Sequence, residues 1–176
     1  MPIKIILLLV LTILFQEEEL VWNKERLLTW SDFKAKAKSQ SPAAAVTASG
    51  LTYNFSLNRI NGEIKGFEAK VVAHFYPQHS WCKHDEITDH ILSHEQFHFN
   101  ITELHARLLR KALTQLKPNS KLEAQINQAY KKINTDLASM QRAYDSETSY
   151  SRNYKRQGEW EEKIIFHINL LNAYKL

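Results

Sequence analysis

The sequence of 176 residues has a single cysteine, Cys82, and few glycines and prolines, four of each. One cysteine excludes an internal disulfide framework and a cysteine-rich zinc site, so we interpret Cys82 as an ordinary, partly buried thiol. The net charge is +4, but the basic residues are scattered and form no basic stripe interleaved with aromatic residues. Because such a stripe is typical of nucleic-acid binding, we expect no nucleic-acid partner.

The sequence also lacks a hydrophobic run long enough to span a bilayer as a helix. Its longest apolar run extends from Ile5 to Phe15, after Lys4, and three glutamates follow Gln16. This length is typical of a secretory signal, with a buried strand or helix of the fold as the alternative. We predict that residues 1–19 form a signal peptide or hydrophobic leader, cleaved or retained, and that the protein is secreted or periplasmic, in the cell envelope. Beyond the leader, helices that interleave acids with bases predict no membrane contact.

Residues 20–176 are predicted to form one α+β domain, a small antiparallel β-sheet followed by three helices. Alternating apolar residues predict strands at 51–57 and 67–76, and the dipeptide Asn61-Gly62 between them predicts a tight turn. Apolar residues then recur at helical spacing in three segments, about 85–117, 120–144 and 153–173. The first of these segments contains no glycine or proline, as a long uninterrupted helix requires.

The first predicted helix contains the pattern H-E-x-x-H, formed by His94, Glu95 and His98. Residues four apart lie one above the other on a helix, so His94 and His98 can both direct an imidazole nitrogen at one Zn²⁺ ion. Glu95 can then take a proton from a water molecule that the metal activates. A histidine-rich, solvated helix is the alternative interpretation. His105 lies about 10 Å beyond His98 along a continuous helix, too far to share the ion, and we interpret it as structural or superficial.

The motif lies in a longer part of the sequence, from about Trp22 to Leu171, that resembles a known protein family. The resemblance is carried by the segments LLTWSDFKAK, AAAVTASGLTY, VVAHFYPQHSW, HILSHEQFHFNITELHARLLRKAL and YDSETSYSRNYKRQGEWEEKI. Together they resemble a bacterial secreted family, domain-of-unknown-function family 922, described as predicted secreted zinc-dependent proteases. The resemblance implies a zincin-like domain with the H-E-x-x-H motif on its first long helix, Zn²⁺ as the cofactor, and the motif's roles for His94, Glu95 and His98.

The resemblance also indicates where a third metal ligand belongs. Family members commonly have a histidine shortly after the segment that matches YDSET, and Tyr150 stands at that place in this sequence. A neutral tyrosine is a poor zinc ligand, because its unperturbed pKa is about 10. Tyr150 is therefore one candidate for the third ligand, and Asp145 or Glu147 is the alternative. The remaining interpretation is a weakened site in a non-catalytic relative.

These observations predict a secreted, zinc-dependent metallopeptidase with Glu95 as the general base and a peptide or protein as the substrate. We expect the substrate to lie along an exposed strand at about 71–75, and Tyr150 is a candidate to stabilise the oxyanion. The alternative is a non-catalytic envelope binding or assembly module on a zincin-like fold. Tyr150 in place of a histidine favours this alternative, whereas the presence of Glu95 speaks against it. No oligomeric state is predicted.

Overall fold

The computed structural model describes residues 18–176, so nearly all of the leader predicted at 1–19 lies outside the described part. The order of elements is strands first and helices second. The strands are β1 (Leu20–Val21), β2 (Ala45–Val46), β3 (Ser49–Ile60), β4 (Glu63–Phe75) and β5 (Trp81–Cys82); the helices are α1 (Asp89–Thr114), α2 (Leu122–Glu147) and α3 (Tyr154–Leu170), with short 3-10 turns η1 (Trp30–Asp32), η2 (Pro77–His79) and η3 (Asn172–Tyr174). The predicted α+β class, a small antiparallel sheet with three helices, is confirmed.

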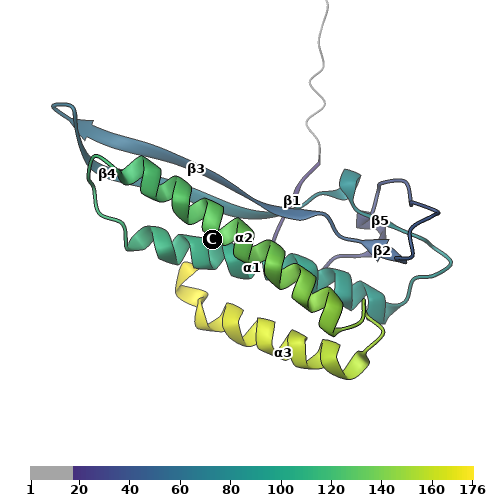
Figure 1. Cartoon of the computed structure of the whole chain (residues 1–176). Coiled ribbons are helices and arrows are strands. Elements are labelled where there is room, and N and C mark those ends of the chain that lie inside the picture. The colour runs from purple at the N-terminus through teal and green to yellow at the C-terminus, as the bar shows by residue number, and fades with distance from the viewer. Residues whose placement is uncertain (1–17) are drawn as a thin grey trace, which may run out of the picture.

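A long antiparallel hairpin of β3 and β4 dominates the sheet and extends along the helices (Figure 1). Its tip is the predicted turn, in which Asn61 and Gly62 both have positive φ angles, 51° and 81°. Two successive left-handed residues match the twist of the flanking strands, which is why Asn-Gly is favoured there. The short β1 pairs with the other edge of β4, with Leu20 opposite Phe75. Strand β4 is thus the central strand of the order β1-β4-β3.

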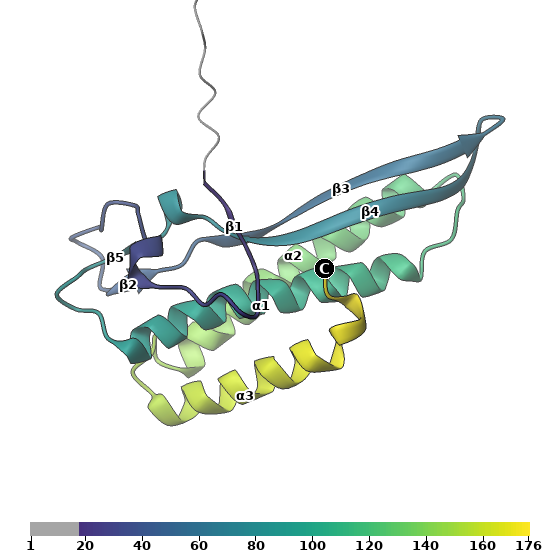
Figure 2. The same cartoon turned by 180° about the vertical axis from the view of Figure 1, so that it is seen from behind.

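Helix α1 lies at the centre of the molecule and packs against the hairpin, α2 and α3, while α2 also contacts β3 (Figures 1 and 2). Its first turn is capped by Thr88, whose hydroxyl accepts the backbone N–H of Ile91 at 3.2 Å. Ile101 and Leu109 in its middle are completely buried. A helix packed on several sides buries polar residues as well as apolar ones, and this is the environment in which the H-E-x-x-H residues lie.

Two arginines, the buried Arg107 and the partly buried Arg110, connect α1 to its neighbours. Arg107 pairs with Glu103 at 2.8 Å and donates to the backbone oxygen of Ile168 on α3 at 2.9 Å. Arg110 donates from Nε and Nη2 to the backbone oxygen of Val71 on β4, at 3.0 and 2.8 Å. Because each guanidinium satisfies carbonyl groups of a different element, the helix is fixed relative to both the sheet and α3.

The single cysteine behaves as predicted, since Cys82 is free and 4% exposed. Trp81 and Trp160 are buried and belong to the core rather than to an exposed surface. Within residues 18–176, none of the helices is both long enough and apolar enough to cross a membrane.

Candidate metal centre

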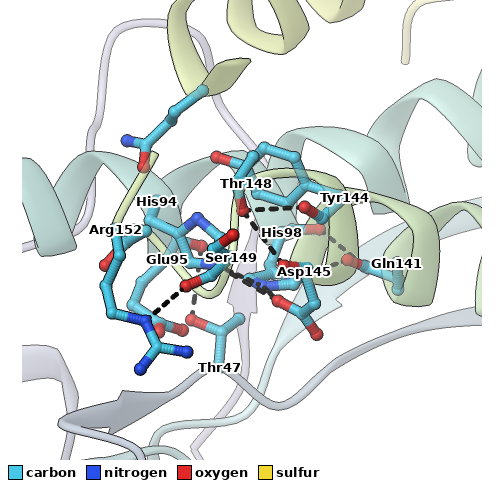
Figure 3. A network of polar contacts seen from close by, with 12 residues as sticks. Thr47, His94, Glu95, His98, Gln141, Tyr144, Asp145, Thr148, Ser149 and Arg152 are labelled. Carbon is cyan, nitrogen blue, oxygen red and sulfur yellow. Dashed lines mark hydrogen bonds and ion pairs between the residues drawn. The ribbon is translucent and has the colours of Figure 1, made fainter. Parts of the chain in front are cut away.

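Three side chains converge where the first half of α1 passes the last turns of α2 (Figure 3). His94 and His98, one turn apart on α1, place their Nε2 atoms 3.2 Å from each other. Asp145 of α2 places Oδ1 at 3.1 Å from His94 Nε2 and 2.9 Å from His98 Nε2. A tetrahedral zinc ion with bonds of about 2.0–2.1 Å sets its ligand atoms about 3.3 Å apart. The three atoms therefore have nearly the spacing that one ion requires.

Two further residues of α2 fix the imidazole rings. Gln141 accepts a hydrogen bond from His98 Nδ1 through Oε1, and its Nε2 donates to the backbone oxygen of His98 at 2.9 Å. Since an amide oxygen only accepts, the ring proton of His98 lies on Nδ1, and the Nε2 lone pair is left for a metal. Tyr144 stacks on the His94 ring with centroids 4.5 Å apart and meets the His98 ring edge-on at 5.2 Å. Gln141 and Tyr144 precede Asp145 by four residues and one residue, which places all three near one face of α2.

The ionisable groups of the centre shift one another's pKa values. Burial alone would raise the pKa of Asp145, but its hydrogen bonds to His94 and His98 and their positive charge hold it well below its usual range. Burial lowers the pKa of His98, yet the hydrogen bond with Asp145 and the negative charges of Glu95 and Asp145 outweigh this and raise it. A positive charge at this point, either a proton on His98 or a cation, is therefore favoured.

Glu95 is 4% exposed, and its Oε2 atom has no hydrogen-bond partner among residues 18–176. In the same part of the molecule, His94 Nδ1 and the Tyr144 hydroxyl are also buried without a partner. Buried polar atoms are almost always hydrogen-bonded in folded proteins, to the chain or to water or an ion. Three orphaned atoms around one ligand cluster thus fit a centre that holds a metal and water.

The centre opens on a cavity of about 710 Å³, within the range of small-molecule and peptide-binding sites. One wall is the segment 42–47, which includes β2, and it is fixed to the motif because the Thr47 hydroxyl donates to the backbone oxygen of Glu95 at 3.2 Å. The rest of the lining comes from Ser49 at the start of β3, from α1, from α2 and from the turn that follows α2. The lining residues are Pro42, Ala43, Ala44, Ala45, Val46, Thr47, Ser49, Ile91, His94, Glu95, His98, Gln141, Asp145, Tyr150, Ser151 and Arg152.

The two candidates for the third ligand lie at different places in this site. Asp145 belongs to the cluster with His94 and His98, in which one ligand atom from each residue lies within 4.8 Å of the others. Tyr150 lines the same cavity, but it is 63% exposed. Its role as a ligand stays a prediction. Glu147, the other carboxylate considered, accepts from Trp160 Nε1 at 3.0 Å and pairs with Arg156.

Two other histidines of α1 lie outside the cluster. His105 is 3% exposed and donates from Nδ1 to the backbone oxygen of Ile101 at 2.8 Å, which agrees with a structural role. His90 donates from Nε2 to the backbone oxygen of Ser151 at 2.8 Å and stacks on Tyr154 with centroids 3.6 Å apart. His90 thus supports the turn after α2.

The expectation that the strand at 71–75 is exposed and receives the substrate is wrong. Residues from Val71 to Phe75 are all buried, at 0–9% exposure. Strand β4 is also paired on both sides at this end, with β3 and β1, and the N–H of Trp22 bonds to the oxygen of Ala73 at 3.0 Å. A central strand whose backbone groups are used on both edges has none left for a peptide. The strands that line the cavity are β2 and, at its first residue Ser49, β3.

The fold and the site together define an α+β domain with a candidate metal centre of two histidines and an aspartate between two antiparallel-packed helices. Comparison with protein families gives a match over residues 28–152 to the family described as "Bacterial protein of unknown function (DUF922)". Because the match covers most of the chain, the protein belongs to this family. Neither the proteins of curated function nor the solved structures gave a significant match.

Proposed function

We propose that the domain is a zincin-like, zinc-dependent metallopeptidase, with His94, His98 and Asp145 holding the ion. The observation that carries this proposal is the convergence of the three ligand atoms within 4.8 Å, beside a buried carboxylate with an unpartnered oxygen. When bound, zinc would lower the pKa of a coordinated water and polarise the carbonyl of the scissile peptide bond. Peptide-bond hydrolysis follows if the chain also supplies a base and a place for the substrate.

Glu95 is the base in this proposal. It follows His94 directly on α1, lines the cavity, and keeps Oε2 without a partner in residues 18–176. That oxygen can accept the proton of the attacking water and later deliver it to the leaving amine. Tyr150, on the rim of the same cavity, is the hydroxyl that we propose for stabilising the oxyanion.

The substrate is proposed to lie along β2 rather than along β4. The backbone N–H of Lys83 bonds to the oxygen of Ala44 at 2.8 Å, and Val46 pairs with Trp81, so positions 44 and 46 direct their backbone groups at β5. Backbone direction alternates along a strand, hence Ala45 and Thr47 direct theirs at the opposite edge. An extended peptide can add to that edge as a further strand, next to the metal ligands.

The test is a comparison of the zinc-loaded protein with Glu95→Gln, using casein and a mixture of fluorogenic peptides. Glu162→Gln, an exposed glutamate on α3, is the matched control. We expect Glu95→Gln to bind one equivalent of zinc and to lose activity by about 100- to 10,000-fold, the usual contribution of a general base, while the control stays at wild-type activity. Equal activity in all three proteins, or no stoichiometric zinc in the folded wild type, would refute the proposal.

Export belongs to the same proposal, because the predicted leader at 1–19 would carry the domain to the cell envelope or beyond. Cell fractionation and mass spectrometry of the N-terminus test this independently of activity. Full-length protein found only in the cytoplasm would contradict it.

A further inference from the structure

The turn that follows α2 has an unusual backbone. Ser149, Tyr150 and Ser151 are three successive non-glycine residues with positive φ angles of 52°, 54° and 66°. The left-handed region is unfavourable for side chains with a Cβ atom, and such strain persists only where neighbouring contacts enforce it. Those contacts are present, because the Tyr150 N–H bonds to the oxygen of Asp145 at 2.8 Å, and His90 bonds to the oxygen of Ser151 at 2.8 Å. Strained segments concentrate at functional sites, so the side chains that this turn presents are of interest.

One of the presented side chains is Arg152, which lines the cavity. Its Nε donates to the backbone oxygen of Ser149 at 2.8 Å, which orients the guanidinium (Figure 3). Within residues 18–176, its two Nη atoms have neither a hydrogen bond nor an ion pair, although many other arginines of the chain are paired. The two free Nη groups form a planar fork, which is the geometry that binds a carboxylate through two parallel hydrogen bonds.

Arg152 differs in its charge from the other residues that line the cavity. Of the described residues that line it, Arg152 is the one lysine or arginine. The segment from Pro42 to Val46, which also lines the cavity, carries only small or apolar side chains, and these offer no competing hydrogen bonds. The carboxylates of Asp145 and Glu95 also line the cavity, and within residues 18–176 neither forms an ion pair with Arg152, since Asp145 pairs with the imidazole rings.

We propose that Arg152 binds a carboxylate of the substrate, so that the cleft prefers peptides with a free carboxylate close to the scissile bond. This inference rests on the proposed function and names the substrate class of the same site. The carboxylate is either the C-terminal α-carboxylate or the side chain of an Asp or Glu, and both present the same group to the guanidinium. Because Arg152 is exposed to solvent, the preference is moderate, about tenfold in affinity.

The experiment measures the binding of matched, short Ala- and Ser-rich peptides to the zinc-loaded protein by fluorescence anisotropy, together with their cleavage. One pair differs by a free or an amidated C-terminus, and the other by an internal Glu or Gln. Each pair is tested with the wild type, Arg152→Gln and Arg152→Lys. Arg142→Gln, which removes an exposed arginine of α2 outside the cavity, is the control. Zinc content and thermal melting show that each variant is folded and loaded.

In the wild type we expect the carboxylate member of one pair to bind about tenfold more tightly than its neutral partner. Arg152→Gln should abolish this ratio, Arg152→Lys should retain part of it, and Arg142→Gln should leave it unchanged. The pair that shows the ratio identifies the source of the carboxylate. A wild type that binds both members of each pair equally or not at all, or a ratio that survives in Arg152→Gln, would overturn the inference. Failure of the proposed function is a separate result, namely selective binding without cleavage of any peptide.

Discussion

The sharpest prediction concerns the third metal ligand, because Asp145 and Tyr150 are distinguishable by substitution. Asp145 Oδ1 lies 3.1 and 2.9 Å from the two imidazole nitrogens, whereas Tyr150 is 63% exposed on the cavity rim. Asp145→Asn keeps the shape of the side chain and removes its charge. Tyr150→Phe removes only a hydroxyl. If Asp145 is the ligand, the first substitution weakens zinc binding and the second does not.

The magnitude follows from the linkage between binding and folding. With free zinc at about 1,000 times its Kd, a single site stabilises the folded state by about 4.1 kcal/mol. For a domain of this size that corresponds to a rise in Tm of about 8–16 °C. Loss of even an outer partner of a metal ligand weakens affinity about 10- to 100-fold, so we take 100-fold as the minimum for Asp145→Asn. At the same zinc concentration its stabilisation then falls to about 1.4 kcal/mol, a rise in Tm of about 3–6 °C.

The assay is differential scanning fluorimetry of each protein with a chelator and with zinc, since the difference cancels any effect of the substitution on the metal-free fold. Tyr150→Phe should give the wild-type difference. If Asp145→Asn keeps the full zinc-induced rise while Tyr150→Phe loses it, the assignment of Asp145 is refuted and Tyr150 takes its place. If the wild type shows no rise at all, the metal centre itself is refuted.

Three further predictions follow from the same contacts. Gln141→Leu removes the acceptor of His98 Nδ1 and should raise the zinc Kd about 10- to 100-fold in competition with a chromophoric chelator; an unchanged Kd would mean that other contacts hold the ring. Ser149→Gly should raise the free energy of unfolding in urea by about 0.5–1 kcal/mol, because glycine removes the strain of a left-handed backbone at some cost in chain entropy. The control, Ser146→Gly in the last turn of α2, should lower the free energy of unfolding by up to about 1 kcal/mol. A protein that is destabilised by Ser149→Gly and stabilised by Ser146→Gly would contradict the strain assigned to the turn. The pKa of His98 is raised in the folded protein, so without metal its pairing with Asp145 contributes fully to the stability of the folded state below about pH 6.5, the pKa of a histidine in the unfolded chain. This contribution is lost as the pH rises through the pKa that His98 has in the folded protein. Zinc must displace that proton, so the zinc-induced rise in Tm should instead grow with pH, and a constant rise between about pH 5.5 and 8 would contradict the competition.

The elements that the sequence predicted correctly are those with a long periodic pattern. The β3–β4 hairpin and the three helices repeat their apolar residues over many positions, and the turn at Asn61 and Gly62 has a specific dipeptide. The strands β1, β2 and β5 have two residues each, too few for any periodicity to be visible. They form only because the folded chain brings a partner strand beside them, so local sequence carries little information about them.

The error about the substrate strand had a visible cause. Alternate apolar residues at 67–76 predict a strand with one apolar face, and the expectation was that its part at 71–75 is exposed. Its last part, VVAHF, is nearly continuous in apolar residues, and a strand buried on both faces has that composition. In the structure even the polar His74 is buried, with only 9% exposed, and its two ring nitrogens contact Thr52 on β3 and Glu19 at 2.8 and 2.9 Å.

The residues of the candidate metal centre also differ in how far local sequence predicts them. His94 and His98 are related by the helical repeat, so the sequence alone places them together. Asp145 comes from another helix, and its position depends on how α2 packs on α1. The helical face that it shares with Gln141 and Tyr144 was the available signal.

Asp145 connects the candidate metal centre to the cavity rim through its carboxylate and through its backbone oxygen. Its carboxylate contacts both imidazole rings, and its backbone oxygen accepts the N–H of Tyr150 in the left-handed turn. Within this turn, the backbone oxygen of Ser149 accepts the Nε–H of Arg152 and so sets the direction of the guanidinium. Two hydrogen bonds therefore separate the proposed substrate-binding guanidinium from the proposed metal ligand. If the Asp145 carboxylate holds a cation, as we propose, the bound cation would also limit the movement of the helix end on which the turn depends. We therefore expect the cavity rim to be more ordered in the zinc-loaded protein than in the metal-free protein.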